Sequence, residues 1–140
     1  MSIVLQMFSE SGCLRVKATG EFSLAEAERT FLEILGAVEQ HKVGKVLIDG
    51  REVEGKPEMM ERFYYGEFAA REASEYAVRN GCACPEFAYV LRVPILDPGR
   101  FGETVAANRG MRIRVSDSLD DACEWLGIAS ANLPDPGDGE

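Results

Sequence analysis

One short apolar run, flanked by glycine on both sides, constrains the fold of this chain more than any other feature. The run Lys45–Asp49 holds three consecutive large apolar side chains between Gly44 and Gly50. A strand covered on one face alternates apolar and polar residues, whereas a continuous apolar run is typical of a strand buried on both faces. Because a helical pattern precedes the run, we expect it to pair in parallel with the strand before that helix, through a βαβ crossover.

The residues before this strand predict a hairpin followed by a helix. Residues 3–8 are expected to form a strand and residues 9–12 a turn, and residues 14–19 alternate as a second strand with one solvent-exposed face. Ser23 and Glu26 match a capping box, so a helix should begin here and run to about Lys42. Its apolar positions repeat at helical spacing and comprise Leu24, Ala27, Phe31, Ile34, Leu35 and Val38.

The second half of the chain continues the alternation of helix and strand. The predicted elements are a long helix from Pro57 to Gly81, a strand over residues 87–93, a helix capped by Asp97 that ends near residues 108–110, a strand over residues 112–115 and a last helix capped by Ser118. The order ββαβαβαβα predicts an α/β domain over residues 1–128, in which a mixed sheet of about five strands packs with four helices. Residues 129–140 are acidic and rich in proline and glycine, which predicts a flexible tail.

The charge of the chain argues against several classes of partner. A net charge of −9 and a pI near 4.7 oppose binding to nucleic acid and to anionic membranes, because such binding depends on clustered lysine and arginine. No apolar stretch is long enough to span a bilayer, and no leader pattern precedes the first strand. We therefore expect a cytoplasmic protein.

The cysteines do not have the spacing of a metal site. Cys82 and Cys84 are separated by one residue, and His41 is the only histidine in the chain. Cys13 and Cys123 lie in apolar patterns typical of packed thiols. Together with the absence of nucleotide-binding motifs, this predicts a protein without metal or cofactor.

Three stretches carry a resemblance to a known family. Residues 46–49 lead into a loop and a long helix, and residues 101–115 and 120–126 form the most recognisable segments. In this order they resemble the STAS domain of anti-sigma-factor antagonists, and more closely its SpoIIAA-like branch, which also looks like the CRAL-TRIO lipid-transfer fold. The resemblance implies a STAS-like fold and a non-catalytic binding module.

The regulatory members of that family present a phosphorylated serine at the start of the second helix. Here residues 49–57 contain no hydroxyl group, and no serine or threonine follows until Ser74. The expected module therefore lacks the phosphoserine switch. It would bind a protein partner or a small apolar or anionic ligand.

Charged residues are expected at the carboxyl ends of the parallel strands, where ligands bind in such sheets. Asp49 and Arg51 follow one strand, and Asp97 and Arg100 follow the next. The simpler interpretation is that the aspartates satisfy loop amides or cap a helix. The alternative is a small cofactor-free enzyme in which Asp49 is the acid, Arg51 an anion clamp and Asp97 the base.

Aromatic residues spread too far around the second helix to fit a single buried stripe. The residues in excess are Tyr64, Tyr65, Phe68 and Tyr76. They could line a pocket, form a self-association face that makes a homodimer, or be ordinary exposed aromatics. Gly66 in mid-helix predicts a close approach of another backbone. An apolar groove under this helix would favour binding, whereas a closed polar pocket with perturbed carboxylates would favour the enzyme.

Overall fold

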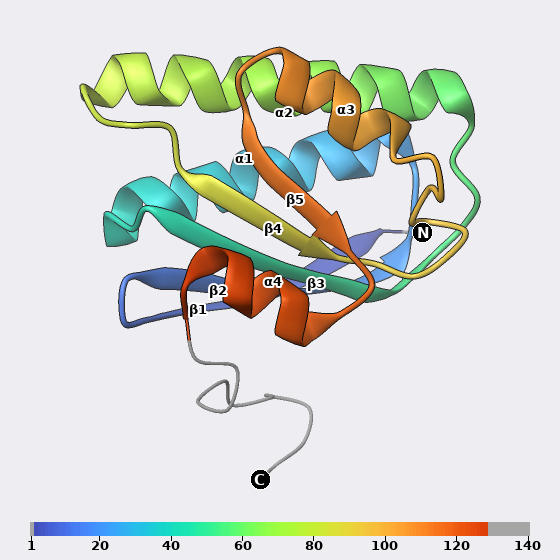
Figure 1. Cartoon of the computed structure of the whole chain (residues 1–140), viewed down its shortest axis with the longest axis horizontal. Helices are drawn as coiled ribbons and strands as arrows, with labels where there is room; N and C mark the ends of the chain where they lie inside the picture. The colour runs from blue at the N-terminus through green and yellow to red at the C-terminus, as the bar shows by residue number, and fades with distance from the viewer. Residues whose placement is uncertain (1, 129–140) are drawn as a thin grey trace, which may run out of the picture.

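Five strands form one mixed sheet with helices on both faces (Figure 1). The computed structural model describes residues 2–128, and the predicted tail of residues 129–140 lies outside them. The elements in chain order are β1 (Ile3–Glu10), β2 (Cys13–Glu21), α1 (Leu24–His41), β3 (Lys45–Glu54), α2 (Met59–Asn80), β4 (Glu86–Val90), α3 (Phe101–Asn108), β5 (Arg112–Ser116) and α4 (Leu119–Leu126). The predicted fold class and element order are confirmed.

The sheet has the spatial order β1-β2-β3-β4-β5. The hairpin strands β1 and β2 are antiparallel, and all later neighbours pair in parallel. β4 and β5 end opposite each other at Val90 and Ser116, beside Asp49 of β3, which continues in the same direction to Glu54. Loops that leave these ends therefore meet at one edge of the domain.

The central strand β3 is buried on both faces, as its apolar run predicts. Val46 and Ile48 pack in the larger core, whose helical residues come from α1, α2 and α3. Leu47 faces the smaller core with Cys13 and Cys123, under α4. Figure 1 shows the same division, with α4 alone on its side of the sheet.

Several boundaries differ from the sequence prediction, three of them by more than two residues. β3 continues past Asp49 to Glu54, because its second half pairs with the end of β2 beyond a register shift. β4 ends at Val90 instead of residue 93, at the point where its pairing with both neighbours stops. The third helix begins at Phe101, although the carboxylate of Asp97 does accept a hydrogen bond from the Phe101 amide at 2.8 Å.

The expectation that β2 has one solvent-exposed face is wrong for its first half. Cys13 is fully buried and Arg15 is only 6% exposed. Cys13 packs against Ala122 and Cys123 of α4. This helix therefore covers the face of β2 that the alternation of apolar and polar residues predicts to be exposed to solvent. The alternation records polarity, and it does not reveal which distant segment folds over a strand.

Gly66 lies where α2 and α3 approach most closely. A Cβ atom at this position would lie 2.6 Å from the carbonyl oxygen of Gly102 and 3.4 Å from the amide nitrogen of Ala106. Both atoms belong to the α3 backbone, which cannot move aside as a side chain can. The predicted close backbone approach at Gly66 is therefore confirmed.

This contact predicts opposite effects for two glycine-to-alanine changes. Gly66→Ala should lower the free energy of unfolding by about 1 to 3 kcal/mol, because α3 must be displaced. Gly36→Ala in α1 meets nothing within 4 Å and should leave stability unchanged or raise it by up to about 1 kcal/mol. Urea unfolding of both variants measures the difference, and equal effects would contradict the close contact.

Candidate functional site: an apolar cavity beneath α2

A cavity of about 160 Å³ lies between the sheet and the helices α1, α2 and α3. It is placed at the carboxyl ends of the strands, where the loop after β4 and the start of α3 contribute to its wall. An apolar cavity of about 150 Å³ engineered into another protein binds benzene. The space in this protein therefore suits a molecule built on one ring. Large apolar residues that line it include Ile3, Leu5, Ile34, Ile48, Leu91 and Ile95.

Small residues at the facing positions create this space. Ala18 on β2, Ala27 on α1, and Ala69 on α2 line the cavity where larger side chains would fill it. Gly50 on β3 also lines it, and a Cβ there would lie 2.8 Å from a methyl group of Leu91. The cavity thus depends on small residues that lie on separate elements of the sequence. Only the fold brings these residues together.

Two tyrosines provide hydroxyl groups to the buried wall. Tyr65 of α2 and Tyr89 of β4 both line the cavity, and their hydroxyl oxygens are 2.7 Å apart. Two hydroxyls carry two protons, and one proton occupies this bond. In residues 2–128 neither hydroxyl has a second hydrogen-bond partner, so one O–H remains without a protein acceptor. An acceptor that reached this O–H would contribute about 0.5 to 1.5 kcal/mol.

Burial keeps both tyrosines neutral. It raises the pKa of Tyr65 to about 12, an effect that the bond from Tyr89 partly offsets. Burial also raises the pKa of Tyr89 well above its ordinary value. The pair therefore acts as a hydrogen-bond donor and acceptor at neutral pH, not as a phenolate.

The loop after β4 is held over the cavity by Arg62 of α2. The guanidinium of Arg62 donates to the carbonyl oxygens of Ile95 at 2.8 Å and Pro94 at 2.7 Å. Asp97 follows in the same loop, and its carboxylate accepts from the amides of Phe101 and Gly99. The bond from the Phe101 amide is the main reason that the pKa of Asp97 lies below its ordinary value.

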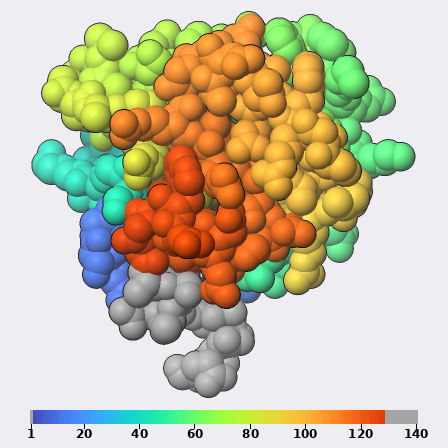
Figure 2. All heavy atoms as spheres, in the orientation of Figure 1, coloured from blue at the N-terminus to red at the C-terminus, as the bar shows by residue number. Residues whose placement is uncertain are grey.

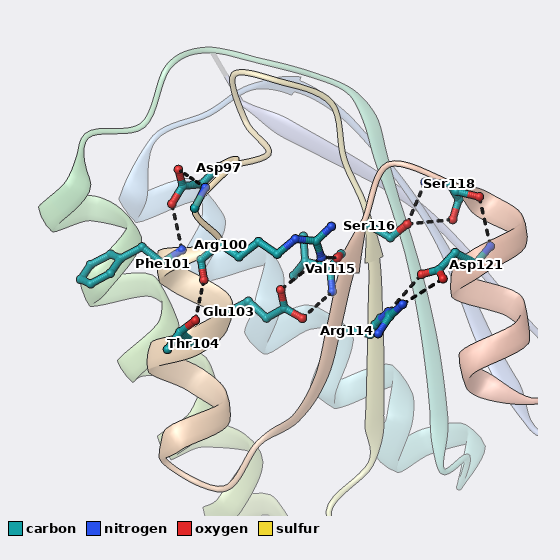
Figure 3. A network of polar contacts seen from close by, with 11 residues as sticks. Asp97, Arg100, Phe101, Glu103, Thr104, Arg114, Val115, Ser116, Ser118 and Asp121 are labelled. Atoms are coloured by element: carbon teal, nitrogen blue, oxygen red, sulfur yellow. Dashed lines mark hydrogen bonds and ion pairs between the residues drawn. The ribbon is translucent and has the colours of Figure 1, made fainter.

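Arg100 and Glu103 bind the outer edge of β5 (Figure 3). The guanidinium of Arg100 donates to the carbonyl oxygen of Val115, and the Val115 amide donates to Glu103 at 3.1 Å. Arg100 and Glu103 also form an ion pair. Both backbone groups of an edge residue are thus satisfied, which blocks pairing with another strand there. Arg100 lines the cavity, but its charge is already engaged by this network.

Asp49 and Arg51 form a pair that lies apart from the cavity. Ile48 and Gly50 line the cavity, and Asp49 alternates with them on β3, so its side chain is directed to the opposite face of the sheet. The guanidinium of Arg51 donates two hydrogen bonds to the carboxylate, at 2.9 and 2.8 Å. Burial opposes ionisation of Asp49, but the bonds from Arg51 outweigh it and its pKa is lowered.

The aromatic residues of α2 separate into three environments. Phe63 stacks on Phe101 of α3, and Phe68 packs edge-on against Phe31 of α1, each at 6.4 Å between ring centroids. Tyr64 is 47% exposed. The helix lies between α1 and α3, so its neighbours on two sides cover aromatic residues that one sheet face could not cover. Of the four residues predicted to be in excess, Tyr65 reaches the cavity and Tyr64 reaches solvent, whereas Tyr76 is buried in the larger core and Phe68 packs against that core.

The structure therefore brings Tyr65, Asp97 and Arg100 to one cavity and leaves the other predicted site residues elsewhere. It also adds Tyr89 and Arg62, which sequence reasoning missed. The sequence does contain one indication of Tyr89, because a tyrosine within an apolar strand needs a hydrogen-bond partner for its hydroxyl.

Residues 2–128 contain neither a candidate metal site nor a candidate membrane span. No group of three histidine, cysteine, aspartate or glutamate side chains in this range could hold a metal ion. No helix in the same range is long and apolar enough to cross a membrane. Figure 2 shows that the segments coloured orange to red, which include α3, β5 and α4, form much of the face of the molecule turned to the viewer.

Comparison with solved structures confirms the fold that the sequence resembles. An anti-sigma-factor antagonist from Mycobacterium paratuberculosis matches with a TM-score of 0.54 and 18% identity, over 90% of this chain and 95% of the other. An uncharacterised protein with a SpoIIAA-like fold from Shewanella loihica matches with a TM-score of 0.48 and 16% identity, over 89% and 93% of the two chains. No family model matches the chain. No curated protein matches it either.

The buried tyrosine pair predicts a loss of stability at alkaline pH. Unfolded tyrosines ionise near pH 10, whereas Tyr65 holds its proton to about pH 12. The stabilisation is therefore complete below pH 10 and is lost as the pH rises toward 12, because only the unfolded chain releases the proton.

At pH 11 this loss should be on the order of 1 kcal/mol relative to pH 8, as measured by urea unfolding. The double variant Tyr65→Phe/Tyr89→Phe should lose less over the same interval. An identical loss in the variant would show that other groups cause the alkaline sensitivity.

Proposed function

We propose that this protein is a non-catalytic binding module that holds a small apolar ligand in the cavity beneath α2. The observation that carries this proposal is a cavity of about 160 Å³ that is walled largely by apolar side chains and lies at the ligand-binding end of the sheet. An apolar groove under this helix favours binding over catalysis, which would need a closed polar pocket with perturbed carboxylates.

The enzyme alternative receives less support from the same geometry. Asp49 would have to serve as an acid, yet its pKa is lowered and it stays ionised at neutral pH. Arg51 would have to clamp an anion, yet its guanidinium donates to Asp49. The proposed base Asp97 accepts from the first amide of α3 and lines a cavity that neither Asp49 nor Arg51 lines. An anionic ligand is disfavoured for the related reason that Arg62 and Arg100 already donate to backbone carbonyls.

Binding can be measured with α-methylstyrene, a neutral one-ring hydrocarbon, by methyl NMR. Methyl groups that line the cavity, such as those of Ile34, Ile48 and Leu91, should shift on titration. Methyl groups in the core under α4, such as those of Leu47 and Leu126, should not. Equal shifts on both faces of the sheet would indicate non-specific association and contradict the proposal.

Filling the cavity should abolish this binding. Ala69→Leu places a larger side chain in the cavity and should weaken binding of α-methylstyrene by about tenfold or more, because the space is no longer empty. Ala77→Leu makes the same change on the same helix outside the cavity and serves as the control. Unchanged affinity in a folded Ala69→Leu variant would place the ligand elsewhere.

A second candidate function is docking of a protein partner on the outer face of α2. Met60 and Tyr64 are one helical turn apart, and they are 54% and 47% exposed. Tyrosine and methionine are enriched at interfaces relative to other surface positions. A second copy of this chain is the partner that can be tested directly.

The double variant Met60→Glu/Tyr64→Glu should then weaken self-association about tenfold or more, as measured by sedimentation or native mass spectrometry. It should leave stability within about 0.5 kcal/mol, because both side chains are exposed. Val78→Glu, at a position 80% exposed near the other end of the helix, is the control. An equal effect in both variants, or a wild type that stays monomeric throughout, would remove self-association from consideration.

A further inference from the structure

The tyrosine pair adds a chemical requirement to the proposed apolar ligand. The hydroxyls of Tyr65 and Tyr89 satisfy each other with one hydrogen bond at 2.7 Å. The proton of the other hydroxyl has no acceptor within residues 2–128. Both tyrosines line the cavity. Buried hydroxyls are ordinarily paired, so an unused donor in the wall of a cavity indicates where a polar atom of a ligand would lie.

The surroundings of the pair restrict that polar atom to a neutral one. Ile48, Leu91 and Ala69 are among the apolar residues that share the cavity with the two rings. A charged group would lose its hydration among them without gaining an ion pair. The arginines of the wall, Arg62 and Arg100, donate to backbone carbonyls at its rim.

We propose that the cavity takes a neutral, one-ring molecule that carries a hydrogen-bond acceptor such as a carbonyl oxygen, which receives the proton left over by the Tyr65–Tyr89 pair. This inference rests on the proposed function, and it adds the ligand class to it. Tyr65 and Tyr89 become the residues that set specificity, while the apolar wall supplies affinity. The pair also adapts to its occupant, since either hydroxyl can donate to the other.

Two probes of the same shape test the inference. Acetophenone carries a carbonyl oxygen where α-methylstyrene carries a methylene group, and benzoate is the charged counterpart. In the wild type, acetophenone should bind at least as tightly as α-methylstyrene although water solvates the ketone better, and benzoate should not bind. The quantity to compare is the ratio of the two dissociation constants, measured by the same methyl NMR titration.

The double variant Tyr65→Phe/Tyr89→Phe removes both hydroxyls and leaves no buried donor unpaired. Its preference for acetophenone over α-methylstyrene should fall by about tenfold, the size expected for one hydrogen bond. Tyr76→Phe, a buried tyrosine of the same helix outside the cavity, should keep the wild-type ratio.

The outcomes distinguish this inference from the proposed function. If α-methylstyrene binds but the ratio is the same in the wild type and the double variant, the cavity binds ligands and the tyrosines do not select them, so the inference is overturned. If benzoate binds best, the ligand is anionic and the inference is overturned as well. If no probe binds the folded wild type, the proposed function and the inference both fail.

Discussion

Burial of β3 on both faces is the constraint on which the rest of the structure depends. Val46 and Ile48 require cover on one side and Leu47 on the other, so helices must lie on both faces of the sheet. Parallel pairing of β2, β3, β4 and β5 follows, because each crossover has to return across the sheet. Parallel pairing in turn brings the loops after β3, β4 and β5 to one edge, where the cavity lies.

The cavity results from the way α2 is positioned over this sheet. At Gly66 the helix approaches the α3 backbone so closely that no side chain fits. One turn further along, Ala69 leaves space between the helix and the strands. The bond between Tyr65 and Tyr89 connects helix to sheet across the wall of that space. Close packing on one side of α2 and small residues beneath it thus produce a stable fold that retains an opening.

Charged residues near this edge stabilise the framework. Asp97 accepts a hydrogen bond from the first amide of α3, Arg62 holds the loop after β4, and Arg100 with Glu103 satisfies the edge of β5. Each charge is committed to a backbone group, and these bonds fix the rim of the cavity. The ligand that we propose would therefore meet an apolar shape and one polar contact here, since these charged groups are already engaged.

The sequence by itself determined the order of elements, the buried strand at Val46–Ile48 and the close approach at Gly66, because each follows from local periodicity or local sterics. It placed candidate residues at the correct edge of the sheet, yet it grouped Asp49 with Asp97, and β3 directs Asp49 to the other face. Only the tertiary structure decided that Tyr65 meets Tyr89 and that distant small residues line one open cavity. These features depend on which segments become neighbours in space, and no local pattern records that.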